Sequence, residues 1–165
     1  MAEGTLYDTD IVAWAEQQVA ELRRLAQAAP SNAVDWDNLI EELEGVGRSQ
    51  VNAVERQLVH LVSHLVKLIS APGSPAARGW RAEIVSFQHV ARKRFSPSMR
   101  RQLDRQELWR DACAEAGAGL SLWGDDLIRG LPAENPFALD ELLSPHFDLD
   151  EALKTLADAI RPTAG

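Results

Sequence analysis

The sequence predicts an all-α protein, a multi-helix bundle of five to seven helices around one long central helix. Apolar residues recur along that central helix at spacings of three and four, the period of a helix face that packs on its neighbours. These residues are Val51, Val54, Leu58, Leu61, Leu65 and Leu68. No stretch of four or more residues shows the apolar–polar alternation of a β-strand, and proline and glycine separate the periodic segments.

The length of 165 residues is that of one ordinary domain, so we expect residues 1–165 to form a single helical domain. No apolar run reaches the roughly 20 residues of a membrane span, and we expect no membrane partner. The single cysteine, Cys113, has no partner for an internal disulfide, and the first ten residues lack an export signal. A reducing cytoplasm is therefore the predicted location.

Two helices are predicted in the N-terminal part of the chain. The first begins at Asp8 or Thr9, because either side chain can cap backbone N–H groups, and it ends before Pro30. The second is the central helix over residues 35–70, with an aspartate as its N-cap. Gly47 is in line with the apolar stripe of this helix, which predicts a close helix crossing or a kink, with backbone approach to a ligand as the alternative.

The segment 71–77 contains two prolines and a glycine, which end the central helix. Because this loop is short, the next helix, over residues 78–95, is predicted to return antiparallel and form a helical hairpin. Ser96 followed by Pro97 marks a new helix start in a changed direction. The remaining helical segments are predicted from residue 104 toward 129, as a short turn at 137–143, and at 148–160.

Four pieces of sequence occur in a recognisable order and spacing. They are LYDTDIVAWAEQQVAELR, then WDNLIEELEGVGRSQ with LVSHLVKL, then GWRAEI, and finally NPFALDELLSPHF. Together they resemble a bacterial family labelled the domain of unknown function 29 family, over about residues 5–147. The resemblance implies an all-helical, cytoplasmic bacterial protein with no assigned activity. Two departures from the family pattern are His60, at a position that is usually apolar, and a C-terminal helical extension over residues 148–165.

The predicted hairpin brings four notable residues to one of its ends: His64, Lys67, Trp80 and Arg81. Trp80 offers a large apolar surface, and Arg81 can bind a carboxylate or phosphate with two hydrogen bonds. We therefore treat these four as a candidate ligand or partner pocket. The alternative is structural, with Trp80 closing the end of the hairpin and Arg81 paired with a local carboxylate.

Histidines at a spacing of four on a helix, here His60 and His64, can bind one metal ion if a third ligand is near. Antiparallel packing places Glu83 and His89 opposite them, so a metal-dependent enzyme with its site in the bundle is an alternative. A histidine at a helix interface is more often a hydrogen-bonded structural residue. We therefore assign no metal site and expect no cofactor.

The formal net charge is −8, but nine of the 17 Lys and Arg residues lie between Arg78 and Arg110. This basic belt resembles a nucleic-acid footprint only in its density, because a chain of pI near 5.0 repels phosphate overall. Internal charge matching is the simpler interpretation, and nucleic acid is an unlikely partner. The residues predicted to form this charge cluster are Glu41, Glu42, Glu44, Arg100, Arg101 and Arg105.

No phosphate-binding glycine loop, nucleophile elbow or CxxC pair is present, and no catalytic residue is assigned. The favoured hypothesis is a non-enzymatic, cytoplasmic helical interaction module. Its partner would be another protein or a second copy of the chain, bound through exposed apolar surface on the central helix or on the C-terminal helices. A metal-dependent enzyme and a nucleic-acid-binding protein are the two alternatives.

Overall fold

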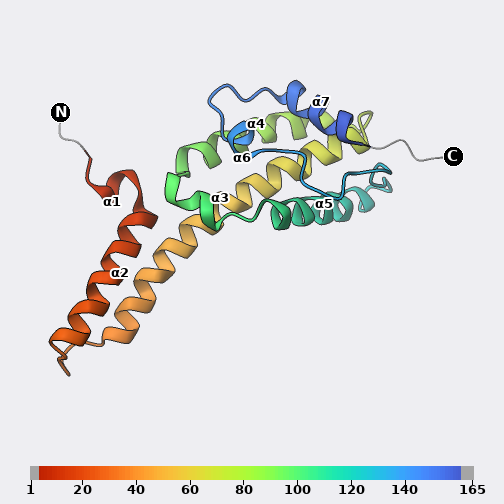
Figure 1. Ribbon diagram of the computed structural model, residues 1–165. Helices are drawn as coiled ribbons and strands as arrows, with labels where there is room; N and C mark the ends of the chain where they lie inside the picture. The colour runs from red at the N-terminus through yellow and green to blue at the C-terminus, as the bar shows by residue number, and fades with distance from the viewer. Residues whose placement is uncertain (1–3, 161–165) are drawn as a thin grey trace. The chain divides into compact units, whose positions relative to one another are not determined.

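The computed structural model describes residues 4–160, and all of the regular structure within them is helical (Figure 1). This confirms the predicted all-α class with a long central helix. The elements are α1 (Leu6–Thr9), α2 (Ile11–Ala28), α3 (Trp36–Ser70), α4 (Ala77–Arg94), the 3-10 helix η1 (Pro97–Gln102), α5 (Arg105–Ser121), α6 (Leu139–Leu142) and α7 (Leu149–Ala159).

The chain groups into two compact units, and helix α3 contributes to both. The first unit contains residues up to Ala53 together with Phe95–Leu103. The second contains Val54–Arg94 together with the residues from Asp104 onward. That residues 1–165 form a single domain stays a prediction, and each unit is described by itself below.

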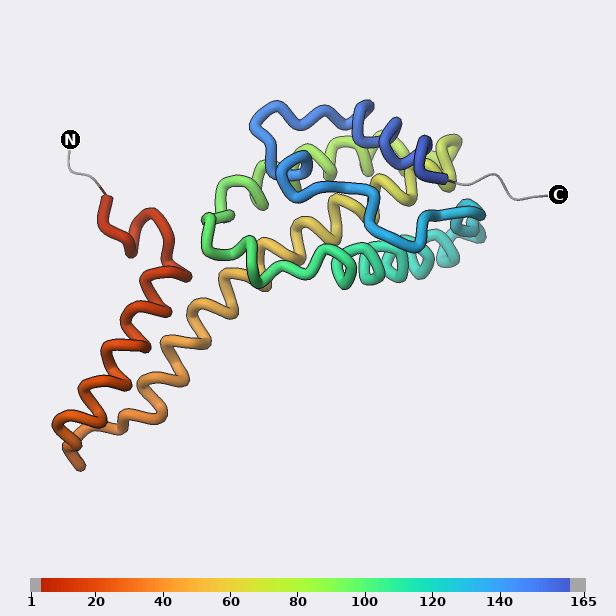
Figure 2. Tube along the Cα trace, in the orientation of Figure 1, coloured from red at the N-terminus to blue at the C-terminus, as the bar shows by residue number. Residues whose placement is uncertain are grey.

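In the first unit, α2 and the first half of α3 form a helical hairpin, visible as two adjacent helices in Figures 1 and 2. The N-cap of helix α2 is Asp10, one or two residues after the predicted Asp8 or Thr9, because the Asp10 carboxylate accepts a hydrogen bond from the backbone N–H of Ala13 (3.0 Å). Asp8 is instead the third residue of the short helix α1, where its carboxylate accepts from the backbone N–H of the N-cap Thr5 (3.0 Å). The buried residues of this unit are Val12, Ala15, Val19, Gly47, Val51, Ser96, Met99 and Leu103.

In the second unit, the rest of α3 is enclosed by the helices around it. The predicted stripe residues Val54, Leu58 and Leu61 have no exposed surface, as expected for a face that packs on its neighbours. Helix α4 returns along α3 as the predicted hairpin partner: the rings of His64 and Phe87 are 5.3 Å apart. Burying a leucine of this kind stabilises a fold by roughly 1.5–3 kcal/mol, so this stripe is a main source of stability.

The segment that follows α5 contacts both α4 and α5. Gln88 on α4 donates to the carbonyl oxygens of Leu142 (3.2 Å) and Ser144 (2.8 Å), which holds the chain around α6. Trp109 on α5 is buried and donates to the carbonyl oxygen of Pro132 (2.9 Å). The last helix, α7, begins after Asp148, as predicted, because that carboxylate accepts from two backbone N–H groups.

The sequence pattern predicted that this helix continues toward residue 129, but helix α5 ends at Ser121. Gly124 has a φ of 77°, a left-handed conformation that closes the helix and is open to glycine without strain. No helix within residues 4–160 is long and apolar enough to cross a membrane.

Candidate functional site

A groove runs along the hairpin of α2 and α3 in the first unit. One section has a volume of about 430 Å³ and the next, toward the hairpin tip, about 640 Å³. Arg23, Glu44 and Arg48 line both sections, so the two adjoin at these charged residues. We call it the hairpin groove. Its apolar lining consists of Val12, Ala15, Val19, Ala20 and Ala26 from α2 and Trp36, Ile40, Leu43 and Gly47 from α3.

The groove is open because the facing residues are small. A Cβ atom added to Gly47 would lie 4.0 Å from the Cβ of Ala15, an ordinary van der Waals distance, so there is room for a methyl group between the two helices. The close crossing or kink at Gly47 stays a prediction. Ala20 and Ala26 on α2 likewise offer only a methyl group to the side chains across from them. The larger residues of α3 are therefore only partly covered, and Ile40 and Leu43 keep part of their surface in solvent.

Charged residues of both signs line the walls of the groove. Arg23 donates to Glu44 (Nη2 to Oε1, 2.5 Å), and Arg48 lies 3.7 Å from the other carboxylate oxygen of Glu44. These side chains remain 35–60% exposed, and exposed ion pairs contribute little to stability. The walls can therefore rearrange to meet charges on a partner at small cost.

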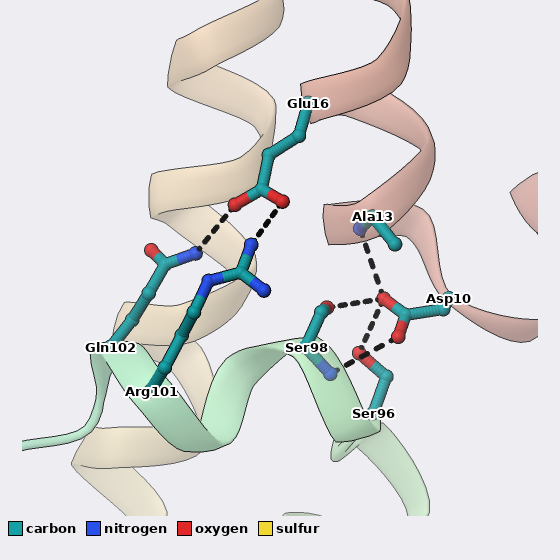
Figure 3. A network of polar contacts seen from close by, with 7 residues as sticks. All are labelled: Asp10, Ala13, Glu16, Ser96, Ser98, Arg101 and Gln102. Atoms are coloured by element: carbon teal, nitrogen blue, oxygen red, sulfur yellow. Dashed lines mark hydrogen bonds and ion pairs between the residues drawn. The ribbon is translucent and has the colours of Figure 1, made fainter.

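One end of the groove is fixed by a polar network between α2 and η1 (Figure 3). Glu16 on α2 accepts hydrogen bonds from Arg101 and from Nε2 of Gln102 (3.2 Å). Beside them, Asp10 accepts from the hydroxyl groups of Ser96 (2.9 Å) and Ser98 (2.5 Å) and from the backbone N–H of Ser98 (3.1 Å). Asp10 thus caps α2 and η1 at once.

Burial raises the pKa of Asp10, but the hydrogen bonds from Ser98, Ala13 and Ser96 lower it more, so the pKa is below its usual value of 3.8. The carboxylate is consequently charged at neutral pH, and the hydrogen bonds it accepts are of the stronger, charge-assisted kind. The sequence predicted only a helix start at Ser96–Pro97. It could not show that Asp10, more than 80 residues away, completes the cap.

Toward the hairpin tip, Trp36 lines the groove, and its indole Nε1 is buried without a hydrogen-bond partner in the part of the chain that is described. A buried donor left unpaired costs roughly 1–3 kcal/mol. Of the predicted charge cluster, Glu41 and Glu44 line this section and Glu42 is exposed.

The four residues of the predicted pocket have separate surroundings in the second unit. His64 and Trp80 are buried, and the Lys67 side chain crosses Gly119, where an added Cβ would lie 2.9 Å from the lysine Cε. Arg81 pairs with Asp150 (3.0 Å). That agrees with the structural alternative for the arginine, although the carboxylate belongs to α7.

Arg81 also lines a mostly apolar hollow of about 400 Å³ beside α7. None of His64, Lys67 and Trp80 is among the residues that line it, so Arg81 reaches this hollow without them. A shared ligand pocket of these four residues stays a prediction.

The two candidate metal-binding histidines are held by different carboxylates. Nδ1 of His60 lies 2.9 Å from Oε2 of Glu115 on α5, and Nε2 of His64 lies 2.7 Å from Oε2 of Glu83 on α4. Phe87 packs against both imidazole rings at 5.3 Å. Among residues 4–160 no three His, Cys, Asp or Glu side chains are grouped so that they could hold a metal ion.

His64 has an acceptor oxygen at each ring nitrogen, because Nδ1 also lies 2.8 Å from the carbonyl oxygen of His60. A neutral imidazole has one N–H, so satisfying both contacts requires one further proton on His64 or on Glu83. Burial and the charge of Lys67 nevertheless lower the pKa of His64 below 6.5, outweighing the opposite effects of the His60 carbonyl and Glu83.

Each of the three arginines in the predicted charge cluster has a contact within its own unit. Arg101 binds Glu16, because η1 lies along the start of α2. Arg105 donates to the carbonyl oxygens of Asn135 (3.3 Å) and Phe137 (2.6 Å). Arg100 lies over the ring of Phe95, 5.7 Å from its centroid. A charge cluster of these arginines with Glu41, Glu42 and Glu44 stays a prediction.

Comparison with known proteins adds the family. A family described as "Domain of unknown function DUF29" matches residues 6–148. The chain belongs to this family. The match confirms the resemblance seen in the sequence, and it ends before helix α7 of this DUF29 protein.

Among solved structures, this DUF29 chain is similar to an alpha-helical protein of unknown function from Rhodospirillum rubrum, determined by crystallography at 1.45 Å resolution. The two chains are 28% identical, with a TM-score of 0.84, over 93% of this chain and 99% of the other. No curated protein matches the chain.

Proposed function

We propose that this DUF29 protein is a non-enzymatic, cytoplasmic helical interaction module, and that it binds a second copy of itself through the hairpin groove. The observation that carries the proposal is the absence of any buried residue from Ala20 to Val46, all of which are described. This segment is nevertheless rich in large apolar residues: Leu22, Leu25, Val34, Trp36, Leu39, Ile40, Leu43 and Val46.

The same stripe of α3 supports a partner on this face. At spacings of three and four, the stripe that is enclosed at Val54 and Leu58 continues back through Gly47, Leu43 and Ile40, and these last three residues line the groove. Helices of this length gain most of their stability from packing an apolar face. A partner that covers the groove would give the hairpin the packing that the rest of α3 already has.

The charges favour a second copy as that partner. A two-fold symmetric interface places the same patch on both sides, so the patch must be complementary to itself. The groove has both signs on its walls, with Arg23 and Arg48 beside Asp37, Glu41 and Glu44. Two such hairpins would form a four-helix bundle, in which ridges of one pair fill the grooves of the other.

The non-enzymatic and cytoplasmic parts of the proposal rest on side-chain chemistry in the second unit. Burial raises the pKa of the Cys113 thiol to about 11, so it is protonated and a poor nucleophile at neutral pH. His60 and His64 are each engaged by a glutamate. The single cysteine cannot form an internal disulfide, which suits a reducing compartment.

The test is the molar mass in solution, measured by size-exclusion chromatography with light scattering. We expect a dimer for the wild-type chain and a monomer for Ala20→Arg, because the arginine would enter the apolar floor of the groove. Gln17→Arg is the matched control: it puts the same side chain at an exposed position of α2 that does not line the groove. A wild-type monomer at the highest soluble concentration, or a dimer that survives Ala20→Arg, would refute the proposal.

A further inference from the structure

A second exposed apolar surface lies in the other unit, at the end of α5. Leu122 and Trp123 are 85% and 79% exposed, the highest values among the large hydrophobic residues that the structure describes. The next highest, Val85, is 60% exposed. We call the pair the Leu–Trp tip. Tryptophan is buried on average, so this degree of exposure in two adjacent apolar residues needs a reason.

Backbone hydrogen bonds hold the Leu–Trp tip in one conformation. The N–H of Asp125 donates to the carbonyl oxygen of Leu120 (3.1 Å), and the N–H of Gly124 donates to that of Ser121 (3.2 Å). With Gly124 at a φ of 77°, these are the two bonds of a Schellman motif. The tip is therefore presented on a closed helix end.

The chain that leaves the tip is also anchored. Leu127 packs so closely on α5 that a Cβ added to Gly117 would lie 3.0 Å from its Cδ1. One residue later, the N–H of Ile128 donates to the hydroxyl of Ser70 on α3 (3.0 Å). Because the turn is fixed on both sides, docking the tip would cost little backbone conformational entropy.

Two carboxylates follow the tip directly, and the Lys67 side chain of α3 crosses α5 about one turn before it, at Gly119. Helix α5 has no basic residue in its last turn, where cations usually offset the negative end of the helix dipole. Asp125 and Asp126 follow directly and add to that potential. An anionic membrane surface would be repelled, whereas a protein surface with lysine or arginine would be attracted.

We propose that the Leu–Trp tip docks into an apolar pocket, rimmed by lysine or arginine, on a different partner protein. Leu122 and Trp123 fill the pocket, and Asp125 and Asp126 pair with its basic rim. Tryptophan is among the residues that most often dominate binding energy at protein interfaces. This site is independent of the hairpin groove, since it lies in the other unit and needs no second copy.

The experiment starts with a photoreactive amino acid in place of Leu122 in the full chain, irradiated in a lysate of the cells that naturally make the protein. The same amino acid at Val85, an exposed position on α4, is the control. The protein cross-linked only from position 122 is identified, its cross-linked peptide is mapped, and the purified protein is then titrated against the wild-type chain. Vesicles of anionic and of zwitterionic lipid are titrated in parallel.

We expect the cross-linked peptide to lie beside lysine or arginine in the partner. Trp123→Ser should weaken binding at least about 30-fold, the usual loss for such an anchor. The double substitution Asp125→Asn and Asp126→Asn should weaken binding less than Trp123→Ser does. Added salt should also weaken binding, because it screens the same charges. Trp123→Ser should leave the oligomeric state of the chain unchanged, which separates this proposal from the function proposed for the groove.

Other outcomes would overturn the proposal. These are cross-links equal to those from Val85, cross-links only to a second copy of the chain, stronger binding to vesicles than to any protein, or an affinity that Trp123→Ser does not change.

Discussion

Replacing Asp10 by asparagine should detach η1 from the start of α2. The carboxylate accepts one bond from the α2 backbone and three from Ser96 and Ser98. Losing an N-cap costs about 1 kcal/mol, and each hydrogen bond to a charged group is worth roughly 1.5–3 kcal/mol. Because asparagine keeps one acceptor oxygen and the same shape, we expect Asp10→Asn to lower the free energy of unfolding by about 2–3 kcal/mol at neutral pH.

The pH dependence of this loss tests its origin. The pKa of Asp10 is lower in the folded protein than its usual value of 3.8, so its contribution is complete above pH 3.8 and disappears as the pH falls through the folded pKa. Urea titrations followed by circular dichroism should therefore give a constant difference between wild type and Asp10→Asn above pH 3.8 and a shrinking one below it.

Asp8→Asn provides the control for Asp10→Asn. Asp8 is also a capping aspartate, but its bonds reach only Thr5, three residues away. If Asp10→Asn cost no more than Asp8→Asn, or if its cost did not change below pH 3.8, the double cap would not stabilise the fold as argued.

Acid should also weaken the fold through His64, whose pKa burial and Lys67 lower, because the unfolded state takes up a proton below pH 6.5 before the folded state does. Wild type should lose stability as the pH falls from 6.5 through the folded pKa, and His64→Gln, which does not titrate, should lose less over the same range in urea titrations. Two glycines should respond in opposite directions to alanine. Gly45→Ala should raise the free energy of unfolding by roughly 0.5–1 kcal/mol, since the nearest atom to the new methyl group is 3.9 Å away. Gly124→Ala should lower it by about 1 kcal/mol because of its left-handed backbone. Thermal unfolding measures both changes, and a shift of the melting temperature in the same direction for both variants would contradict this reasoning.

The fold was largely predictable because its determinants are local or periodic. The spacing of Val54, Leu58 and Leu65 identifies the enclosed face of α3, and Asp148 identifies the start of α7, without any knowledge of distant residues. The apolar period continues to Leu127 and therefore predicts a later end for α5 than the structure has. Gly124 ends the helix by its backbone conformation, which a period cannot reveal.

The candidate site was much less predictable, because its contacts join residues that are far apart in sequence. The bond between Ser98 and Asp10 spans 88 residues, and the pair of Arg101 with Glu16 spans 85. Both depend on the direction the chain takes after Pro97, which a hairpin register cannot supply. The exposure of a side chain likewise depends on residues distant in sequence. Leu120 and Leu122 are both leucines near the end of α5, yet only Leu120 is buried.

The two halves of the apolar stripe of α3 differ in what packs against them. Around Leu61 and Leu65 the stripe is enclosed by side chains of the same chain. Between Trp36 and Gly47 the stripe lines a groove, to which α2 contributes Val12 and Val19 but also the smaller Ala15, Ala20 and Ala26. Larger residues at Ala20 and Ala26 would fill the groove from within the chain. The small size of these alanines makes sense if the missing volume is supplied by another chain, and filling it from within, as with Ala20→Leu, should stabilise the monomer while it weakens the dimer.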